Sequence, residues 1–79
     1  MKLSSAVSQK ILKICNEKNI SINKLASICC LTQSTVQSLI DGKSKNPKML
    51  TIIRICEWLD IPLKEFFNDN LFDNIERED

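Results

Sequence analysis

Apolar residues recur every three or four positions through successive stretches of this chain. The first stretch shows the spacing in Val7, Ile11, Ile14 and Cys15, with charged residues on its other faces. A period of 3.6 residues places such side chains on one face of a helix. No stretch has the strict alternation and turn dipeptides of a β-hairpin. The sequence therefore predicts an all-α fold of five short helices.

Residues that start or stop helices separate these stretches. Helix starts are predicted at Ser4 or Ser5, Ser21, Thr32, Asn46–Pro47 and Pro62. Their side chains cap free N–H groups, or their rings suit a first helical turn. Helix ends are predicted at Asn19 and Gly42, because both residue types tolerate a left-handed backbone.

The chain has 79 residues, of which 43% are hydrophobic, one is glycine and two are proline. This length suits one domain with a small core, and the composition excludes a disordered chain. We expect a folded domain over residues 1–67, followed by an acidic, solvated tail over residues 68–79; a docking segment is the alternative. No apolar run approaches the ~18 residues that span a bilayer, and the first residues lack the apolar stretch of a signal peptide. We therefore expect a cytoplasmic protein.

Four cysteines and no histidine raise the question of a metal site or a disulfide. Cys15, Cys29, Cys30 and Cys56 form no CxxC pair, and zinc sites need such a spacing or histidine partners. We expect no metal, no cofactor and reduced thiols that fill the core as small apolar groups. Redox or metal sensing is the alternative.

The charges are unevenly distributed along the chain. Residues 1–54 hold nine Lys or Arg against Glu17 and Asp41, a net charge of +7, whereas residues 55–79 have a net charge of −6. A basic body with an acidic end predicts a surface that faces a polyanion, and a separate tail.

The stretch TQSTVQSLIDGKSKNP, residues 32–47, predicts a helix with a polar front followed by a basic loop. The small residue Ala26 lets this helix approach the preceding one closely. The inner contacts fall to Leu25, Cys29, Leu31, Val36 and Leu39. This spacing is that of a helix-turn-helix. The outward face carries amides, hydroxyls and one carboxylate: Gln33, Ser34, Gln37, Ser38 and Asp41. The amides and hydroxyls suit the hydrogen-bonding edges of DNA bases, although an ordinary solvated face is the alternative.

Over residues 6–67 the sequence resembles the Cro/Xre-type repressor family of lambda-repressor-like domains. The segments ISINKLASICCLTQSTVQSLIDGK and NPKMLTIIRICEWLDIPLKEFF carry the resemblance. It implies base contacts by Gln33, Ser34, Gln37 and Ser38. It also implies DNA-backbone contacts by Ser21, Asn23, Lys43, Lys45, Asn46 and Lys48. The likeness further implies a homodimer whose interface includes Leu63 and Phe66.

Three positions depart from the family pattern. Cys30 replaces the turn glycine, so it should adopt a left-handed conformation at a cost of roughly 1 kcal/mol. Ile22 replaces a glutamine at the start of the second helix, which removes one DNA contact. Asp60 replaces the glycine that follows the fourth helix.

We expect a sequence-specific double-stranded DNA-binding protein, a transcriptional repressor that binds a palindromic operator as a homodimer. The alternative is a protein-binding module, such as the antitoxin of a toxin–antitoxin pair, that uses Leu50, Trp58 or the acidic tail. An enzyme is not expected, because the chain has no histidine, no nucleophile–base pair and no glycine-rich phosphate loop.

Overall fold

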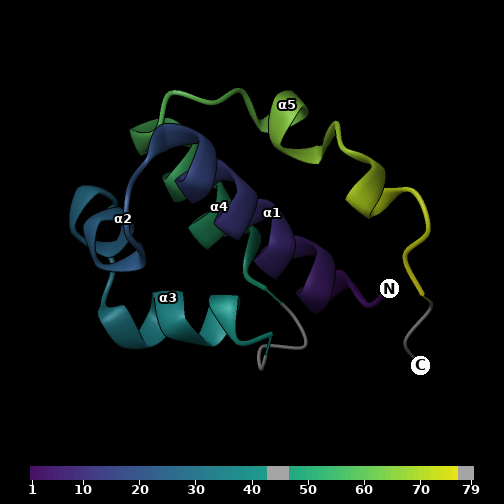
Figure 1. Ribbon diagram of the computed structural model, residues 1–79, viewed down its shortest axis with the longest axis horizontal. Helices are drawn as coiled ribbons and strands as arrows, with labels where there is room; N and C mark the ends of the chain where they lie inside the picture. The colour runs from purple at the N-terminus through teal and green to yellow at the C-terminus, as the bar shows by residue number, and fades with distance from the viewer. Residues whose placement is uncertain (43–46, 77–79) are drawn as a thin grey trace.

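The computed structural model describes residues 1–42 and 47–76, and these residues form helices and connecting turns without a strand. The elements are α1 (Leu3–Lys18), α2 (Ile22–Ile28), α3 (Gln33–Ile40), α4 (Met49–Trp58), α5 (Leu63–Phe67) and the 3₁₀ turn η1 (Asn70–Phe72) (Figure 1). The predicted all-α class with five α-helices is confirmed. Three residues with predicted DNA contacts, Lys43, Lys45 and Asn46, lie outside the described residues.

The long helix α1 is the centre of the fold. Figure 1 shows α3 along one side of α1 and the segment that follows α5 near the other. The contacts between elements agree with this arrangement, because α1 packs against α3 and also against η1. The Ser8 hydroxyl of α1 also donates a hydrogen bond to the Ile40 carbonyl at the end of α3. The end of α3 is therefore anchored to α1.

One apolar core joins all five helices. Its buried members are Val7, Ile11, Ile14, Cys15, Leu25, Ala26, Cys29, Val36, Leu39, Ile52, Ile55, Cys56, Leu59 and Phe66. Burial raises the pKa of Cys29 to about 11, and it also raises the pKa values of Cys15 and Cys56. These three thiols are therefore less able to ionise than ordinary cysteine thiols. These three cysteines fill the core as the sequence predicts, whereas Cys30 is exposed, so the prediction of a core-filling thiol is wrong for Cys30.

Each of the first four helices is followed, one or two residues after its end, by a residue with a left-handed backbone. The φ angles are 57° at Asn19, 55° at Cys30, 67° at Gly42 and 56° at Asp60. Asn19 and Gly42 follow the helices that the sequence predicts them to end, and the expected left-handed conformation of Cys30 is confirmed. Only Gly42 is free of a Cβ penalty, and a Cβ built there would meet nothing within 4 Å.

The helix starts agree with the sequence in part. Ser21 accepts a hydrogen bond from the Lys24 N–H, and Thr32 accepts one from the Thr35 N–H, as predicted for caps. The start of α1 was predicted too late. This helix begins at Leu3, with no side-chain cap from Lys2, and Ser4 lies buried in its first turn. Conversely, α4 begins at Met49, after the predicted start at residues 46–47.

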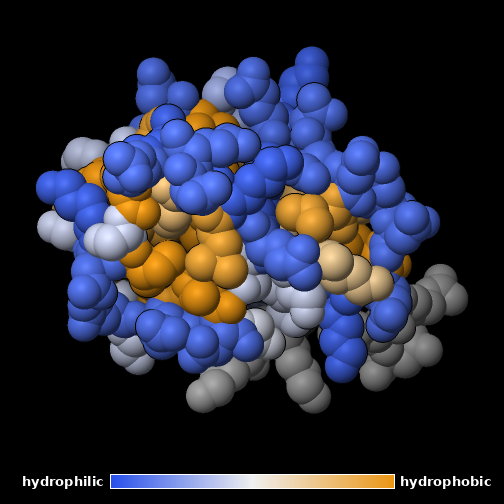
Figure 2. Space-filling view, viewed as in Figure 1, coloured by the Kyte–Doolittle hydropathy of each residue, from blue (hydrophilic) through white to orange (hydrophobic). Residues whose placement is uncertain are grey.

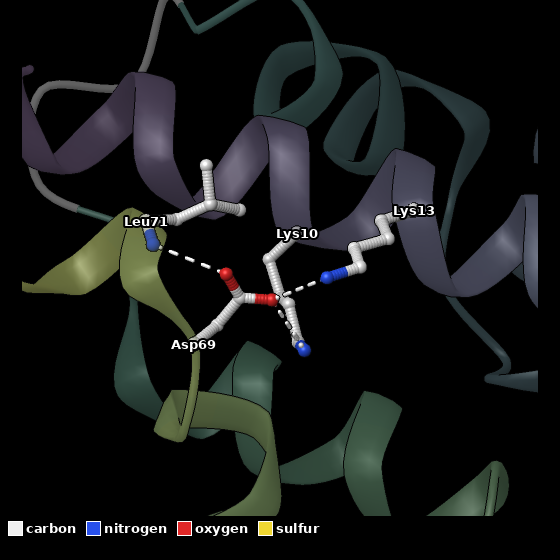
Figure 3. A network of polar contacts seen from close by, with 4 residues as sticks. All are labelled: Lys10, Lys13, Asp69 and Leu71. Atoms are coloured by element: carbon white, nitrogen blue, oxygen red, sulfur yellow. Dashed lines mark hydrogen bonds and ion pairs between the residues drawn. The ribbon is translucent and has the colours of Figure 1, made fainter.

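The segment after α5 folds back onto α1. The Asp69 carboxylate lies 3.1 Å from the Lys10 Nζ and 2.9 Å from the Lys13 Nζ, and it accepts the Leu71 N–H (Figure 3). The Asp69 and Lys10 side chains are only 9% and 12% exposed. The hydrogen bond from Lys13, followed by those from Leu71 and Lys10, lowers the pKa of Asp69. Part of the predicted solvated tail is therefore docked: Asp69, Leu71 and Phe72 are only partly exposed, whereas residues 73–76 are exposed.

Two further contacts hold the same segment. Phe72 packs on the core and its ring centroid lies 5.0 Å from that of Phe67, in an edge-to-face arrangement. The Glu76 N–H donates to the Met1 carbonyl at 2.9 Å. The acidic end thus neutralises part of the basic body instead of standing apart from it. Seen from the same side as Figure 1, the surface in Figure 2 is mostly hydrophilic, and it has a hydrophobic area between α1, α2 and α3.

Candidate nucleic-acid interface

The turn between α2 and α3 sets the angle between the two helices. The Cys30 N–H donates to the Ser27 carbonyl and the Leu31 N–H donates to the Ala26 carbonyl, which closes the end of α2. The chain then reverses direction through the left-handed Cys30, and Thr32 caps the new helix. Leu25 is fully buried and Ala26 is nearly so, and both lie on the inner side of α2. This is the geometry of a helix-turn-helix, in which the second helix is presented to DNA.

Helix α3 has one buried and one exposed side. Val36 is fully buried and Leu39 is 5% exposed, so these two residues attach the helix to the core. Gln33, Ser34 and Gln37 are exposed, while Ser38 is half-buried. Residues one turn apart lie on the same face of a helix, so the two glutamines form one exposed row.

The first glutamine of this row is held by α2. Gln33 Nε2 donates a hydrogen bond of 2.6 Å to Asn23 Oδ1, and both side chains are exposed. The sequence predicts a base contact for Gln33 and a backbone contact for Asn23. The structure brings the two residues together, which sequence reasoning did not anticipate, because the pairing depends on how α2 and α3 pack.

The second glutamine is held by the end of its own helix. Gln37 Nε2 donates a hydrogen bond of 2.9 Å to Asp41 Oδ1, one turn further along. The sequence predicts Asp41 on the outward face of α3, without a DNA contact of its own. The spacing of four residues is a detectable signal for such a side-chain pair.

The hydroxyls on the other side of α3 lie near the start of α4. Ser34, Ser38, Lys48 and Thr51 line a solvent-open hollow between these two helices. A second hollow, between α2 and α3, is lined in part by Asn23, Gln33 and Gln37. The predicted base-contacting residues are thus flanked by residues with predicted backbone contacts: Asn23 on one side and Lys48 on the other. Ser21 is exposed, and its hydroxyl oxygen caps α2.

The residues predicted for self-association lie in different surroundings. Leu63 is 37% exposed, but Phe66 is fully buried against Phe67 and Phe72. A side chain with no exposed surface cannot touch a second molecule. The prediction for Phe66 is therefore corrected: its ring fills the core of its own domain.

The geometry of α2, α3 and their turn defines a helix-turn-helix DNA-binding protein. The chain belongs to the Cro/C1-type HTH DNA-binding domain family, whose model matches residues 10–70. Its structure is similar to the crystal structure of the prophage Lp1 protein 11, with a TM-score of 0.82 and 32% sequence identity. That similarity covers 95% of this chain and 100% of the other. No curated protein matches the sequence.

Within residues 1–42 and 47–76, no group of three or more Cys, Asp or Glu side chains is arranged to hold a metal ion. None of the helices described is both long and apolar enough to cross a membrane.

Proposed function

We propose that this protein is a transcriptional repressor that binds double-stranded DNA sequence-specifically, as a homodimer on a palindromic operator. The observation that carries the proposal is the exposed row of α3, where the Gln33 and Gln37 amides are each held by a neighbouring oxygen. Side chains that are already oriented lose less entropy when they bind. Glutamine can pair with adenine through one donor and one acceptor in the major groove.

Contacts with the DNA backbone are proposed on both sides of this row. Ser21 and Asn23 lie at the start of α2, and Lys48 immediately precedes α4. The first N–H groups of a helix attract phosphate, and a lysine adds a full positive charge. Such contacts position the protein on the duplex, while α3 reads the bases. The same role is proposed for Lys43, Lys45 and Asn46, which lie outside the described residues.

A dimer is proposed because one recognition helix reads only a few base pairs. Two copies related by a two-fold axis would place half-sites about one helical turn apart, ~34 Å. Leu63 supports this proposal, because it is partly exposed at the start of α5 and lines a largely apolar hollow with Ile53, Ile61 and Pro62. Glu57 and Asp60 also line this hollow. The interface is proposed around Leu63 without the buried Phe66.

The test compares two substitutions on a selected operator and on random duplex DNA. Gln33→Ala should cost on the order of 1–3 kcal/mol of operator binding and relax base preference at one symmetric position. Lys48→Ala should weaken binding to both duplexes almost equally and reduce the salt dependence of affinity. If each substitution weakens binding to the operator and to random duplex DNA by the same factor, α3 does not read bases.

A second candidate function is binding of a partner protein, as in the antitoxin of a toxin–antitoxin pair. It is favoured by Leu50 and Trp58, which are 68% and 56% exposed on α4. Large apolar side chains this exposed are typical of contact surfaces when they cluster. A stable co-purifying protein that is lost in Leu50→Ser and Trp58→Ser variants, with operator binding unchanged, would support this candidate.

A further inference from the structure

We propose that Asp41 is a positioning residue that makes Gln37 select adenine over guanine at one base pair of each half-site. This inference rests on the proposed function. It concerns a carboxylate on the surface that meets DNA, where a negative charge opposes binding to every sequence. We therefore expect this carboxylate to have a role that offsets its repulsion of DNA.

Asp41 and Gln37 are connected at two points. The Gln37 side chain donates from Nε2 to the Asp41 carboxylate at 2.9 Å. The Asp41 backbone N–H donates to the Gln37 carbonyl, also at 2.9 Å. Both side chains are exposed, while the neighbouring Val36 and Leu39 fix the helix to the core. The pair is therefore attached to a rigid element and faces solvent.

The chemistry of the pair allows only one orientation of the glutamine amide. An ionised carboxylate has acceptors and no donor, so only the NH₂ group of Gln37 can face it. A flipped amide would set two acceptors against each other and lose the hydrogen bond. Because one of the two Nε2 hydrogens of Gln37 bonds to Asp41, the Gln37 amide retains one N–H donor and the Oε1 acceptor.

This remaining pair of groups matches adenine and not guanine. In the major groove, adenine presents the N7 acceptor beside the N6 donor, whereas guanine presents two acceptors, N7 and O6. A free glutamine can turn both of its N–H groups toward guanine. Held by Asp41, Gln37 has a single hydrogen left for the base, so one guanine acceptor stays unpaired, which is costly in an interface.

The other glutamine lacks this constraint. Gln33 bonds to Asn23, and an amide can either donate or accept. The Gln33–Asn23 pair can therefore reverse as a unit, with Asn23 as donor. Only Gln37 is held in one orientation by the charge of its partner, so Gln33 is the internal control.

The experiment measures affinities of the full chain for operator duplexes that carry A·T or G·C at the Gln37 position. Asp41→Ala should lower the preference for adenine by about tenfold. The same substitution should raise affinity for random duplex DNA, because a negative charge is removed. Preference at the Gln33 position should not change. Asp41→Asn should raise affinity for random duplex DNA in the same way and should also lower the adenine preference, because an asparagine amide can donate as well as accept, as in the Gln33–Asn23 pair.

The same substitution made in a Gln37→Ala protein separates positioning of Gln37 from a general effect on the helix. Adding Asp41→Ala to Gln37→Ala should leave the ratio of affinities for the two duplexes unchanged. The inference is overturned if Asp41→Ala preserves the adenine preference, or if it lowers that preference equally without Gln37. A wild-type protein with no sequence preference would contradict the proposed function and this inference together. Adenine preference at the Gln37 position that survives Asp41→Ala would contradict the inference alone.

Discussion

Cys30 shows how a single backbone angle constrains this motif. Its φ of 55° lies in the left-handed region, where any side chain with a Cβ is crowded by the backbone. The turn nevertheless forms, because Leu25 and Ala26 before it and Val36 after it are buried in one core. Packing of two helices thus outweighs a local cost of roughly 1 kcal/mol.

Replacing Cys30 with glycine should stabilise the protein. Glycine removes Cβ crowding worth roughly 1 kcal/mol but gives the unfolded chain more freedom, which costs ~0.4–1 kcal/mol, so we expect a net gain of up to about 0.6 kcal/mol in the free energy of unfolding. Urea denaturation monitored by circular dichroism measures it. Cys30→Ala should change stability by only a few tenths of a kcal/mol, and Cys30→Val should destabilise. A glycine variant less stable than the alanine variant would show that the left-handed angle carries little cost.

At the scale of elements, the contact between Asp69 and α1 predicts acid sensitivity. The lysines lower the pKa of Asp69, so the contact stabilises the fold fully above the unfolded pKa of ~3.9. That contribution is lost as pH falls from about 4 toward the lower pKa of the folded state. Asp69→Asn should therefore lower the thermal midpoint at pH 7, with the difference from wild type narrowing below about pH 4.

A matched control uses an acidic residue of the same segment without such contacts. Asp73 is exposed and, among the described residues, makes no ion pair, so Asp73→Asn should leave the midpoint nearly unchanged at both pH values. A constant difference between wild type and Asp69→Asn from pH 7 down to pH 2 would mean that Asp69 acts through packing and not through its charge.

The elements show where sequence reasoning was sufficient. Ser21, Thr32 and the left-handed residues act within one turn of the chain, so the local sequence predicts them. The docking of Asp69 on Lys13 joins residues 56 positions apart, and no local pattern encodes that contact. The burial of Phe66 also depends on Phe72, which lies in the segment expected to be solvated. The Gln37–Asp41 pair was predictable from its spacing, whereas Gln33–Asn23 needed the packing angle of two helices.

For the whole molecule, the proposed dimer gives a direct prediction. Leu63→Asp places a charge in the apolar hollow beside Ile61, so it should shift the protein toward monomer and weaken operator binding more than random binding. Sedimentation equilibrium and titration with labelled operator measure the two effects. Leu12→Asp is the matched control, because Leu12 is 42% exposed on α1, and it should leave assembly unchanged. A Leu63→Asp protein that remains dimeric would place the interface elsewhere.

The contact between Asp69 and α1 also has a consequence during synthesis. Lys13 is made 56 residues before its partner, and a ribosome adds about 5–20 residues per second, which gives a delay of roughly 3–11 s. Small helical domains fold in microseconds to milliseconds once their residues are present. The first helix made is therefore among the last to complete its contacts, and translation, not folding, sets that time. Until then Lys10 and Lys13 remain on the nascent chain as free positive charges.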